Sequence, residues 1–271
     1  EEAPEFLVGE PTGGKDVGGA EDTSHEFDGS DRHVQVEGTR VHEFLAHLGL
    51  VAMAGGRETA NRAAAFGVVA GGGVLAAADS PAAGVQSFST TGGYPPGSTM
   101  KLSTSLALIR QGYTPDSLVN CSPTATINGR VFSNHPAYPT SLMGMVPLST
   151  AVAASCNTAF LNASTQISSQ EFTSAAASLG LGVDYDTGFG AFYGSVPMVD
   201  DPVEHAAGMI GQGQVLMSPL ALAAEAASVA NGHTTIPYLI ETQQPTSTAQ
   251  PLTTDEAAKL RDLMQQVVSR G

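Results

Sequence analysis

Apolar residues recur at helical spacing in several parts of the chain. Met100, Leu102, Leu106 and Ile109 form one such apolar face, which follows the turn residues Pro95–Gly97 and ends at Gly112. The same periodicity predicts further helices over 148–154, 158–167, 170–180, 219–230 and 254–270. In the last of these, Leu260, Leu263, Met264 and Val267 are predicted to share one side.

Short apolar runs between turn signals predict strands. Two such runs flank a glycine cluster between residues 66 and 78, a pattern typical of a β-hairpin. No Lys-Ser or Lys-Thr follows these glycines, so they do not predict a phosphate-binding loop. Shorter strands are predicted at 125–127 and 130–132, within a polar and turn-rich stretch, and loops at 79–93 and 184–193.

Residues 1–66 differ from the rest of the chain. They hold 13 of the 26 acidic residues and a glycine-rich, loop-like stretch at 13–19. Weak alternation predicts a strand over 33–41, and apolar periodicity predicts helices over 41–54 and 57–65. This region is predicted to be part of a small accessory domain or a linker, with the main domain over 67–271.

Composition indicates a mostly folded protein. The 271 residues are 42% hydrophobic and 14% charged, which is enough to bury a sizeable core. The net charge of −15 argues against nucleic acid and against an anionic membrane surface as partners. No run of about 18 apolar residues predicts a membrane span, and we expect any targeting segment to have been removed or to lie outside this sequence.

Ser98 and Lys101 stand at the start of the first predicted helix, three residues apart and on one face. Serine becomes a nucleophile when a base takes its proton, and a buried lysine can serve as that base once its pKa falls. The alternative is that Ser98 is a helix N-cap and Lys101 a solvated lysine. The chain has only three lysines, so one at this spacing beside an apolar helix favours the catalytic interpretation.

A second candidate segment, Ser155-Cys156-Asn157, lies between two predicted helices. A hydroxyl and a carboxamide two residues apart can both face one cleft while the middle side chain turns into the core. Alternatively, Ser155 or Asn157 is simply a helix cap. The two cysteines, Cys121 and Cys156, permit a disulfide without requiring one, and we expect buried free thiols rather than a bridge.

Two further candidate motifs, for zinc and for a dinucleotide, lack the residue spacing that these sites require. His42 and His47 are five residues apart and diverge around a helix, so they do not match a zinc protease motif and are interpreted as ordinary polar positions. Gly211 and Gly213 lack the third glycine of a dinucleotide-binding loop.

Taken together, these segments resemble class B penicillin-binding proteins, the D,D-transpeptidases. The resemblance runs from about residue 68 to 271 and is carried by three blocks: Tyr-Pro-Pro-Gly-Ser-Thr-Met-Lys at 94–101, Ser-Cys-Asn-Thr-Ala-Phe at 155–160, and Ile-Gly-Gln-Gly-Gln-Val-Leu-Met-Ser-Pro-Leu-Ala-Leu-Ala at 210–223. The alanine-rich composition and the Ser-Cys-Asn form look actinobacterial. A lipoprotein-type member with an NTF2-like N-terminal domain is a plausible relative.

The resemblance implies an α+β fold of the penicillin-binding and serine β-lactamase type, in which an antiparallel sheet is flanked by helices and one part is all-helical. It implies that Ser98 attacks the carbonyl of a D-Ala-D-Ala stem peptide and that Lys101 takes the serine proton. Ser155 would pass a proton to the leaving amine. Asn157 would bind the substrate amide and help hold Lys101.

The resemblance also implies partners and surroundings. Gly211, Gln212 and Gly213 are expected to contact substrate. The expected partners are peptidoglycan stem peptides, β-lactam antibiotics and other proteins of cell-wall synthesis or division, with no cofactor, metal or nucleic acid. The enzyme would be extracytoplasmic and held at the membrane by an N-terminal helix or lipid that this sequence does not include.

One departure from the family pattern affects the predicted activity. No Lys-Ser/Thr-Gly motif occurs in the chain, and the corresponding family strand supplies an oxyanion-hole donor whose loss typically costs ~10²–10³ in rate. We therefore expect this sequence to be an incomplete catalyst with segments missing. The alternatives are a β-lactamase or D,D-carboxypeptidase on the same fold, for which no clear water-activating glutamate is found, and a catalytically silent cell-wall scaffold.

Overall fold

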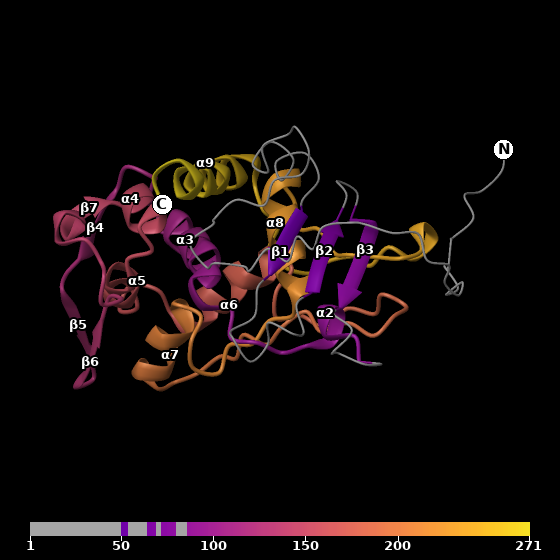
Figure 1. Ribbon diagram of the computed structural model, residues 1–271, viewed down its shortest axis with the longest axis horizontal. Coiled ribbons are helices and arrows are strands. Elements are labelled where there is room, and N and C mark those ends of the chain that lie inside the picture. Colours follow the sequence, from indigo (N-terminus) through magenta and orange to yellow (C-terminus); the bar gives the residue numbers. More distant parts are fainter. Residues whose placement is uncertain (1–49, 54–63, 69–71, 80–85) are drawn as a thin grey trace, which may run out of the picture.

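The computed structural model describes residues 50–53, 64–68, 72–79 and 86–271 (Figure 1). Its sheet has three antiparallel strands in the order β1 (Leu50–Met53), β2 (Ala64–Val68) and β3 (Val74–Asp79). Helix α8 (Pro219–Asn231) packs against β1 and β2. The sheet lies at one end of the helical part, which contains most of the described chain (Figure 1).

The predicted hairpin is confirmed, because β2 and β3 pair across the glycine cluster with Phe66 opposite Ala77. The helices predicted over 41–54 and 57–65 are wrong where they can be tested, since residues 50–53 and 64–65 are strands. Backbone pairing between β1 and β2 decides the conformation of these short alanine-containing runs, which suit a helix equally well by pattern. The strand predicted over 33–41, His42 and His47 lie outside the described residues.

Helix α3 (Lys101–Arg110) lies at the centre of the helical part and is mostly buried. It follows directly from the 3₁₀ turn η3 (Gly97–Met100). Three helices pack on it: α6 (Ser169–Ser178), α7 (Pro202–Met209) and α9 (Thr254–Arg270). The helix that begins with the first candidate motif is therefore enclosed by three other helices.

Polar contacts, as well as apolar packing, fix α3 against its neighbours. Thr104 Oγ1 donates to the carbonyl of Met209 in α7 at 2.7 Å. Ser103 Oγ donates to Glu225 Oε1 in α8 at 2.9 Å, and Arg110 forms a 2.9 Å ion pair with Glu256 in α9. Glu225 is buried, which raises the pKa of its carboxyl to about 8. Burial therefore favours a neutral carboxylic acid at this position near pH 7.

Helix boundaries follow the capping signals in the sequence. α6 begins after Ser168 and α9 after Thr253, each with a capping box to a glutamate three residues on. α8 begins at Pro219 and ends before Gly232, as predicted. In α9, Leu260 and Leu263 are fully buried, whereas Met264 and Val267 are 36% and 43% exposed, so the buried stripe is narrower than the predicted one.

Two short helices and one pair of strands were also not predicted. α2 (Phe88–Thr91) lies in the predicted loop 79–93, where Ser89 donates to Asp79 at the end of β3. α7 is short and starts at the Asp201 cap. The strands β4 (Leu118–Cys121) and β7 (Gly144–Pro147) pair across a long separation that no local pattern announces.

The predicted strands at 125–127 and 130–132 are confirmed as the hairpin of β5 (Thr124–Ile127) and β6 (Arg130–Ser133). Helices α4 (Leu148–Ala153) and α5 (Asn157–Ala163) follow β7, and α5 packs on β4 and β5. The short turns η4 (Thr140–Leu142) and η5 (Glu241–Gln243) complete the described elements. Over the described part of the chain, no helix combines the length and apolar character that a membrane crossing needs.

Candidate active site

The first motif is carried by one continuous helical turn. Ser98 lies in η3 and is exposed, whereas Lys101, the first residue of α3, is only 2% exposed. Because the two residues are three positions apart on one helical face, the lysine amine reaches back to the serine. Lys101 Nζ lies 2.8 Å from Ser98 Oγ.

A close backbone contact supports the turn that presents Ser98. Gly97 has φ +58° and donates its N–H to the carbonyl of Gly211 at 2.9 Å. A Cβ added to Gly211 would lie 1.9 Å from the Gly97 carbonyl oxygen, far inside contact distance. Only a glycine at position 211 allows the two backbones to approach this closely.

Ser155 occupies the left-handed residue at the end of α4. Its N–H bonds the carbonyl of Val152 at 3.0 Å, and the N–H of Cys156 bonds that of Ala151 at 2.8 Å. These two bonds form a Schellman motif, in which the left-handed position is usually glycine. Ser155 holds it with φ +55°, a conformation that costs an L-residue roughly 1–2 kcal/mol. This conformation places the Ser155 hydroxyl beside Lys101.

The four candidate side chains form one hydrogen-bonded network. Lys101 Nζ lies 2.9 Å from Ser155 Oγ, 3.1 Å from the Ser155 carbonyl and 2.6 Å from Asn157 Oδ1. The two serine hydroxyls are 2.8 Å apart. With Ser98, the amine therefore has four oxygen neighbours, and an ammonium group can donate to three of them. A neutral amine fits the same geometry, because its lone pair can accept a proton from a serine hydroxyl.

The surroundings of Lys101 favour that neutral form. Burial lowers the pKa of the Lys101 amine from 10.5 to about 8. The Phe160 ring closes one side, with its centroid 5.9 Å from Nζ. A base whose pKa lies near the working pH combines a useful neutral fraction with enough basicity to take a proton.

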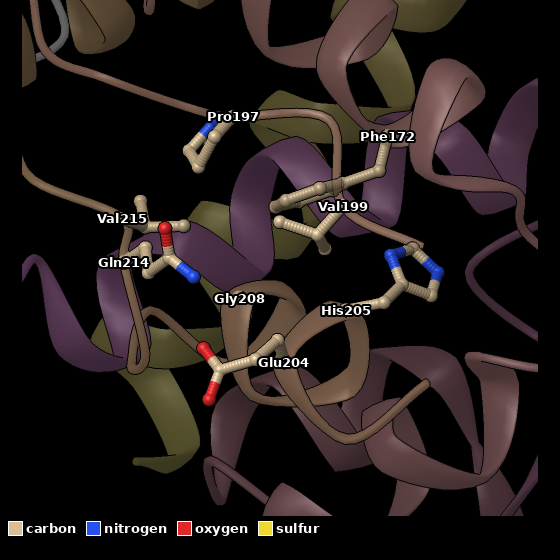
Figure 2. Close-up of a pocket in the computed structure, with 8 residues that line it drawn as sticks. All are labelled: Phe172, Pro197, Val199, Glu204, His205, Gly208, Gln214 and Val215. Atoms are coloured by element: carbon tan, nitrogen blue, oxygen red, sulfur yellow. The ribbon is translucent and has the colours of Figure 1, made fainter. Parts of the chain in front are cut away.

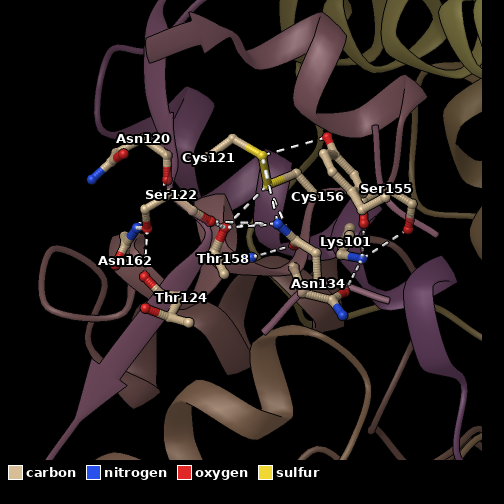
Figure 3. Close-up of a disulfide and its surroundings, with 12 residues drawn as sticks. Lys101, Asn120, Cys121, Ser122, Thr124, Asn134, Ser155, Cys156, Thr158 and Asn162 are labelled. Atoms are coloured by element: carbon tan, nitrogen blue, oxygen red, sulfur yellow. Dashed lines mark hydrogen bonds between the residues drawn. A yellow bond between two sulfur atoms is a disulfide. The ribbon is translucent and has the colours of Figure 1, made fainter. Parts of the chain in front are cut away.

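The segment Ser155–Asn157 meets the geometric expectation from its spacing. Ser155 and Asn157 both face Lys101, while Cys156 is fully buried. Figure 3 shows Ser155 beside Lys101 and Cys156 bonded to Cys121. Cys156 is not a free thiol, because it forms a disulfide with Cys121 at the end of β4. The expectation of free thiols was therefore wrong. No local pattern indicated the pairing, since β4 itself was not predicted.

The third predicted segment, Gly211 to Gly213, lies next to the site, but its residues differ in exposure. Gly211 is buried under the Ser98 turn, whereas Gln212 and Gly213 are exposed. Two backbone hydrogen bonds of 2.8 Å between Tyr94 and Met217 tie the chain before Ser98 to the chain after this segment. The structure thus brings Gly211 to the nucleophile turn.

Two cavities occur away from these four side chains. One, of about 10 Å³, has room for roughly one water and is lined by residues of α6, α7 and the segments around 197–199 and 214–215 (Figure 2). There His205 Nε2 bonds the carbonyl of Ile167 at 2.7 Å, and its buried Nδ1 has no partner. The other, of about 360 Å³, is lined by residues 233–252. In the described ranges, no cluster of His, Cys, Asp or Glu side chains could hold a metal ion.

An antiparallel sheet beside a helical part, with a Ser-Lys pair on a central helix and a Ser-Asn pair opposite, defines the class of penicillin-binding and serine β-lactamase-like folds. The penicillin binding protein transpeptidase domain family matches residues 66–271. This chain belongs to that family, which confirms the resemblance and the fold class expected from the sequence.

Two mycobacterial relatives have been named by activity. Peptidoglycan D,D-transpeptidase PbpA of Mycobacterium tuberculosis is 31% identical over 166 residues, which are 60% of this chain and 34% of the relative. Its counterpart in Mycolicibacterium smegmatis is 30% identical over 184 residues, which are 65% and 37%. The chain thus spans about a third of the length of the curated relatives it matches.

Solved structures agree on the fold. Penicillin-binding protein A of M. tuberculosis, as its penicillin G acyl-enzyme complex, aligns with a TM-score of 0.62 at 29% identity over 70% of this chain and 47% of that one. A penicillin-binding protein from Helicobacter pylori gives a TM-score of 0.67 over 78% of this chain and 47% of that one. At 20% identity, this second likeness shows the fold alone.

Proposed function

We propose that this chain is the catalytic part of a peptidoglycan D,D-transpeptidase that works through a serine acyl-enzyme. One observation carries the proposal: the buried amine of Lys101 lies within hydrogen-bond distance of both serine hydroxyls, at 2.8 and 2.9 Å. That geometry matches the requirement for an activated nucleophile, namely a base in contact with the serine and further groups that orient the base.

In the proposed acylation, Ser98 Oγ attacks the carbonyl carbon between the two D-alanines of a stem peptide. The hydroxyl proton passes to the neutral amine of Lys101. As the peptide bond breaks, Ser155 Oγ passes a proton to the leaving amine of the terminal D-alanine and is resupplied by Lys101. Its 2.8 Å contact with Ser98 Oγ and 2.9 Å contact with Lys101 Nζ support this relay.

Asn157 has two parts in the proposal. Its Oδ1 accepts from Lys101 Nζ at 2.6 Å and so holds the amine between the serines. Its amide nitrogen would bond the substrate backbone. The acyl-enzyme is then attacked by the amine of a second stem peptide, which forms the cross-link and frees Ser98. A β-lactam would acylate Ser98 by the same first step.

Gly211, Gln212 and Gly213 would line one side of the substrate site. Gly211 would also support the turn that carries Ser98, through its contact with Gly97. The backbone N–H of Ser98 would give half of the oxyanion hole.

We further propose an extracytoplasmic location with membrane anchoring by a segment outside this sequence, and partners among other cell-wall synthesis or division proteins. Residues 1–66 would be an accessory region before a transpeptidase domain at 67–271.

The test is intact-protein mass spectrometry after incubation with a β-lactam, on this chain and on the full-length natural protein. A stable added mass that is lost in Ser98→Ala is expected. Absence of any adduct on the full-length protein would leave the silent-scaffold alternative. Turnover of the adduct with release of hydrolysed β-lactam would favour a β-lactamase or carboxypeptidase.

The acylation rate should also depend on pH in a defined direction. Since Lys101 is the base and burial lowers its pKa to about 8, the rate should fall as the pH drops below about 8. Stopped-flow acylation from about pH 6 to 9 measures this limb. A rate that stays constant across that range would contradict the role of Lys101.

A further inference from the structure

Helix α5, which begins at Asn157, has no cap of its own. Its N-cap residue is Cys156, whose side chain makes no capping hydrogen bond. The N–H of Thr158 is instead bonded by Asn134 Oδ1 at 3.1 Å, from a residue just beyond β6. Asn134 therefore does from a distance what an N-cap side chain normally does within the helix.

Asn134 is also fixed on its other side. It is 8% exposed, and its Nδ2 donates to Thr158 Oγ1 at 3.2 Å and to the Ser122 carbonyl at 3.4 Å. Thr158 is fully buried, and its hydroxyl donates to the same Ser122 carbonyl at 2.6 Å. The amide thus joins the start of α5 to the turn between β4 and β5 (Figure 3).

The disulfide makes a second connection between the same two parts. It links Cys156, which lies between the two site residues Ser155 and Asn157, to Cys121 at the end of β4. The Tyr138 hydroxyl lies 3.4 Å from Cys121 Sγ and is the donor, because a disulfide sulfur carries no proton. Both cysteines are fully buried.

We propose that Asn134 and the Cys121–Cys156 disulfide act as one clamp that positions Ser155 and Asn157 against Lys101. This inference rests on the proposed function and makes Asn134 a positioning residue. Ser155 needs such support because it holds a left-handed conformation that its own backbone disfavours. A misplacement of about 1 Å among reacting groups can cost ~10²-fold in rate, so a clamp remote from substrate can matter to catalysis.

The first experiment compares β-lactam acylation rates of wild type, Asn134→Ala and Asn134→Asp. We expect Asn134→Ala to acylate roughly 10- to 100-fold more slowly. Asn134→Asp keeps the acceptor for the Thr158 N–H and should retain more activity. Ser168→Ala, which removes the exposed cap of α6, is the matched control for a general loss of stability.

A second measurement does not depend on acylation. The chain contains only three lysines, so NMR of labelled lysine side chains can follow the titration of Lys101, with Lys101→Arg for assignment. If the clamp holds Ser155 and Asn157 against the Lys101 amine, Asn134→Ala should let water reach that amine. The pH midpoint of the Lys101 titration should then rise. Ser168→Ala should leave that midpoint unchanged.

The disulfide is tested by Cys121→Ser/Cys156→Ser alone and combined with Asn134→Ala. Two parts of one clamp should give effects that are less than additive, because either change releases the same segment. Fully additive effects would overturn the single clamp. An unchanged Lys101 midpoint in Asn134→Ala, or an acylation rate within twofold of Ser168→Ala, would overturn the role of Asn134.

These readouts separate the two proposals. If wild type forms no adduct, the proposed function fails while the lysine titration still decides the clamp. If the adduct forms and the titration does not respond to Asn134→Ala, the clamp fails and the proposed function stands.

Discussion

The two halves of the candidate site meet at one amine but are held in place by different means. Ser98 and Lys101 lie in a single helical turn, so their spacing is fixed by the helix itself. Ser155 and Asn157 lie on either side of a break between α4 and α5, where the first has a positive φ and the second begins a helix whose own N-cap residue makes no capping hydrogen bond. The first half depends on neighbours in sequence, and the second on contacts from across the fold.

The unfavourable terms of the two halves also differ. In the first half, the unfavourable contribution to stability is electrostatic, because the Lys101 amine is removed from water. In the second half it is conformational, because Ser155 takes a backbone conformation that glycine adopts more easily. A substitution that relieves one of these two terms should therefore stabilise the fold while it lowers activity, and each half of the site offers one such substitution.

The largest effect should come from the shared amine. Lys101→Met keeps an unbranched apolar stem but removes the base, and acylation by a β-lactam should slow by ~10²–10⁴. Thermal unfolding checks that the variant is folded. Lys259→Met, at a partly exposed lysine paired with Asp255, is the control and should acylate as wild type does. A Lys101→Met rate within tenfold of wild type would refute the assignment of the base.

The disulfide should dominate the stability of the second half. Closing a loop over a sequence separation of 35 residues is worth about 4 kcal/mol in the chain-entropy account. Cys121→Ala/Cys156→Ala should lower the free energy of unfolding by that order, as measured by urea denaturation. A loss below about 1 kcal/mol would mean that the reduced chain is already held in place by other contacts.

Behind the first half, Glu225 should make stability depend on pH. Its raised pKa means that the folded state keeps a proton between pH 4.5 and about 8 that the unfolded state has released, so stability falls as the pH rises through this window. Glu225→Gln removes this term and should be more stable than wild type by roughly 4 kcal/mol near pH 7.5, with little difference near pH 4. Equal pH dependence of unfolding in the two proteins would show that Glu225 is not the source.

The smallest predicted effect isolates the strain at Ser155. Ser155→Gly and Ser155→Ala both remove the hydroxyl, so both should acylate slowly. Glycine tolerates φ +55° and alanine does not, so the glycine variant should be more stable than the alanine variant by about 1 kcal/mol. Chemical denaturation of the pair measures this difference. Equal stability would indicate that the backbone relaxes once the hydroxyl is gone.

The same contrast separates what sequence can predict from what it cannot. The helix after Pro96, the Ser98–Lys101 spacing and the last helix from Thr254 to Arg270 are local, and local patterns predicted them. The spacing of Ser155 and Asn157 also allowed them to face one group, which in the structure is the Lys101 amine. The pairing of Cys121 with Cys156 could not be predicted, because Cys121 lies at the end of a strand that pairs only with a distant one.

Residues that act through long-range contacts left no trace in the pattern. Asn134 looked like one more polar residue in a turn-rich stretch, although it caps a helix 24 positions away. The strands at 50–53 and 64–65 were mistaken for helix because short apolar runs suit both, and only pairing with a neighbour decides. Gly211 was noted for its motif, but its contact with Gly97 is visible only in three dimensions.

The contact between Gly97 and Gly211 has a consequence for how this protein can evolve. A side chain at 211 would meet the Gly97 carbonyl oxygen at 1.9 Å, so a single substitution there shifts the turn that carries Ser98. If a β-lactam acylates Ser98 as proposed, selection by that antibiotic could therefore not reshape this side of the Ser98 turn by a substitution at 211 alone. The atoms in the way belong to the Gly97 backbone, so no change of side chain at 97 relieves the contact, and we expect escape variants to arise elsewhere around the site first.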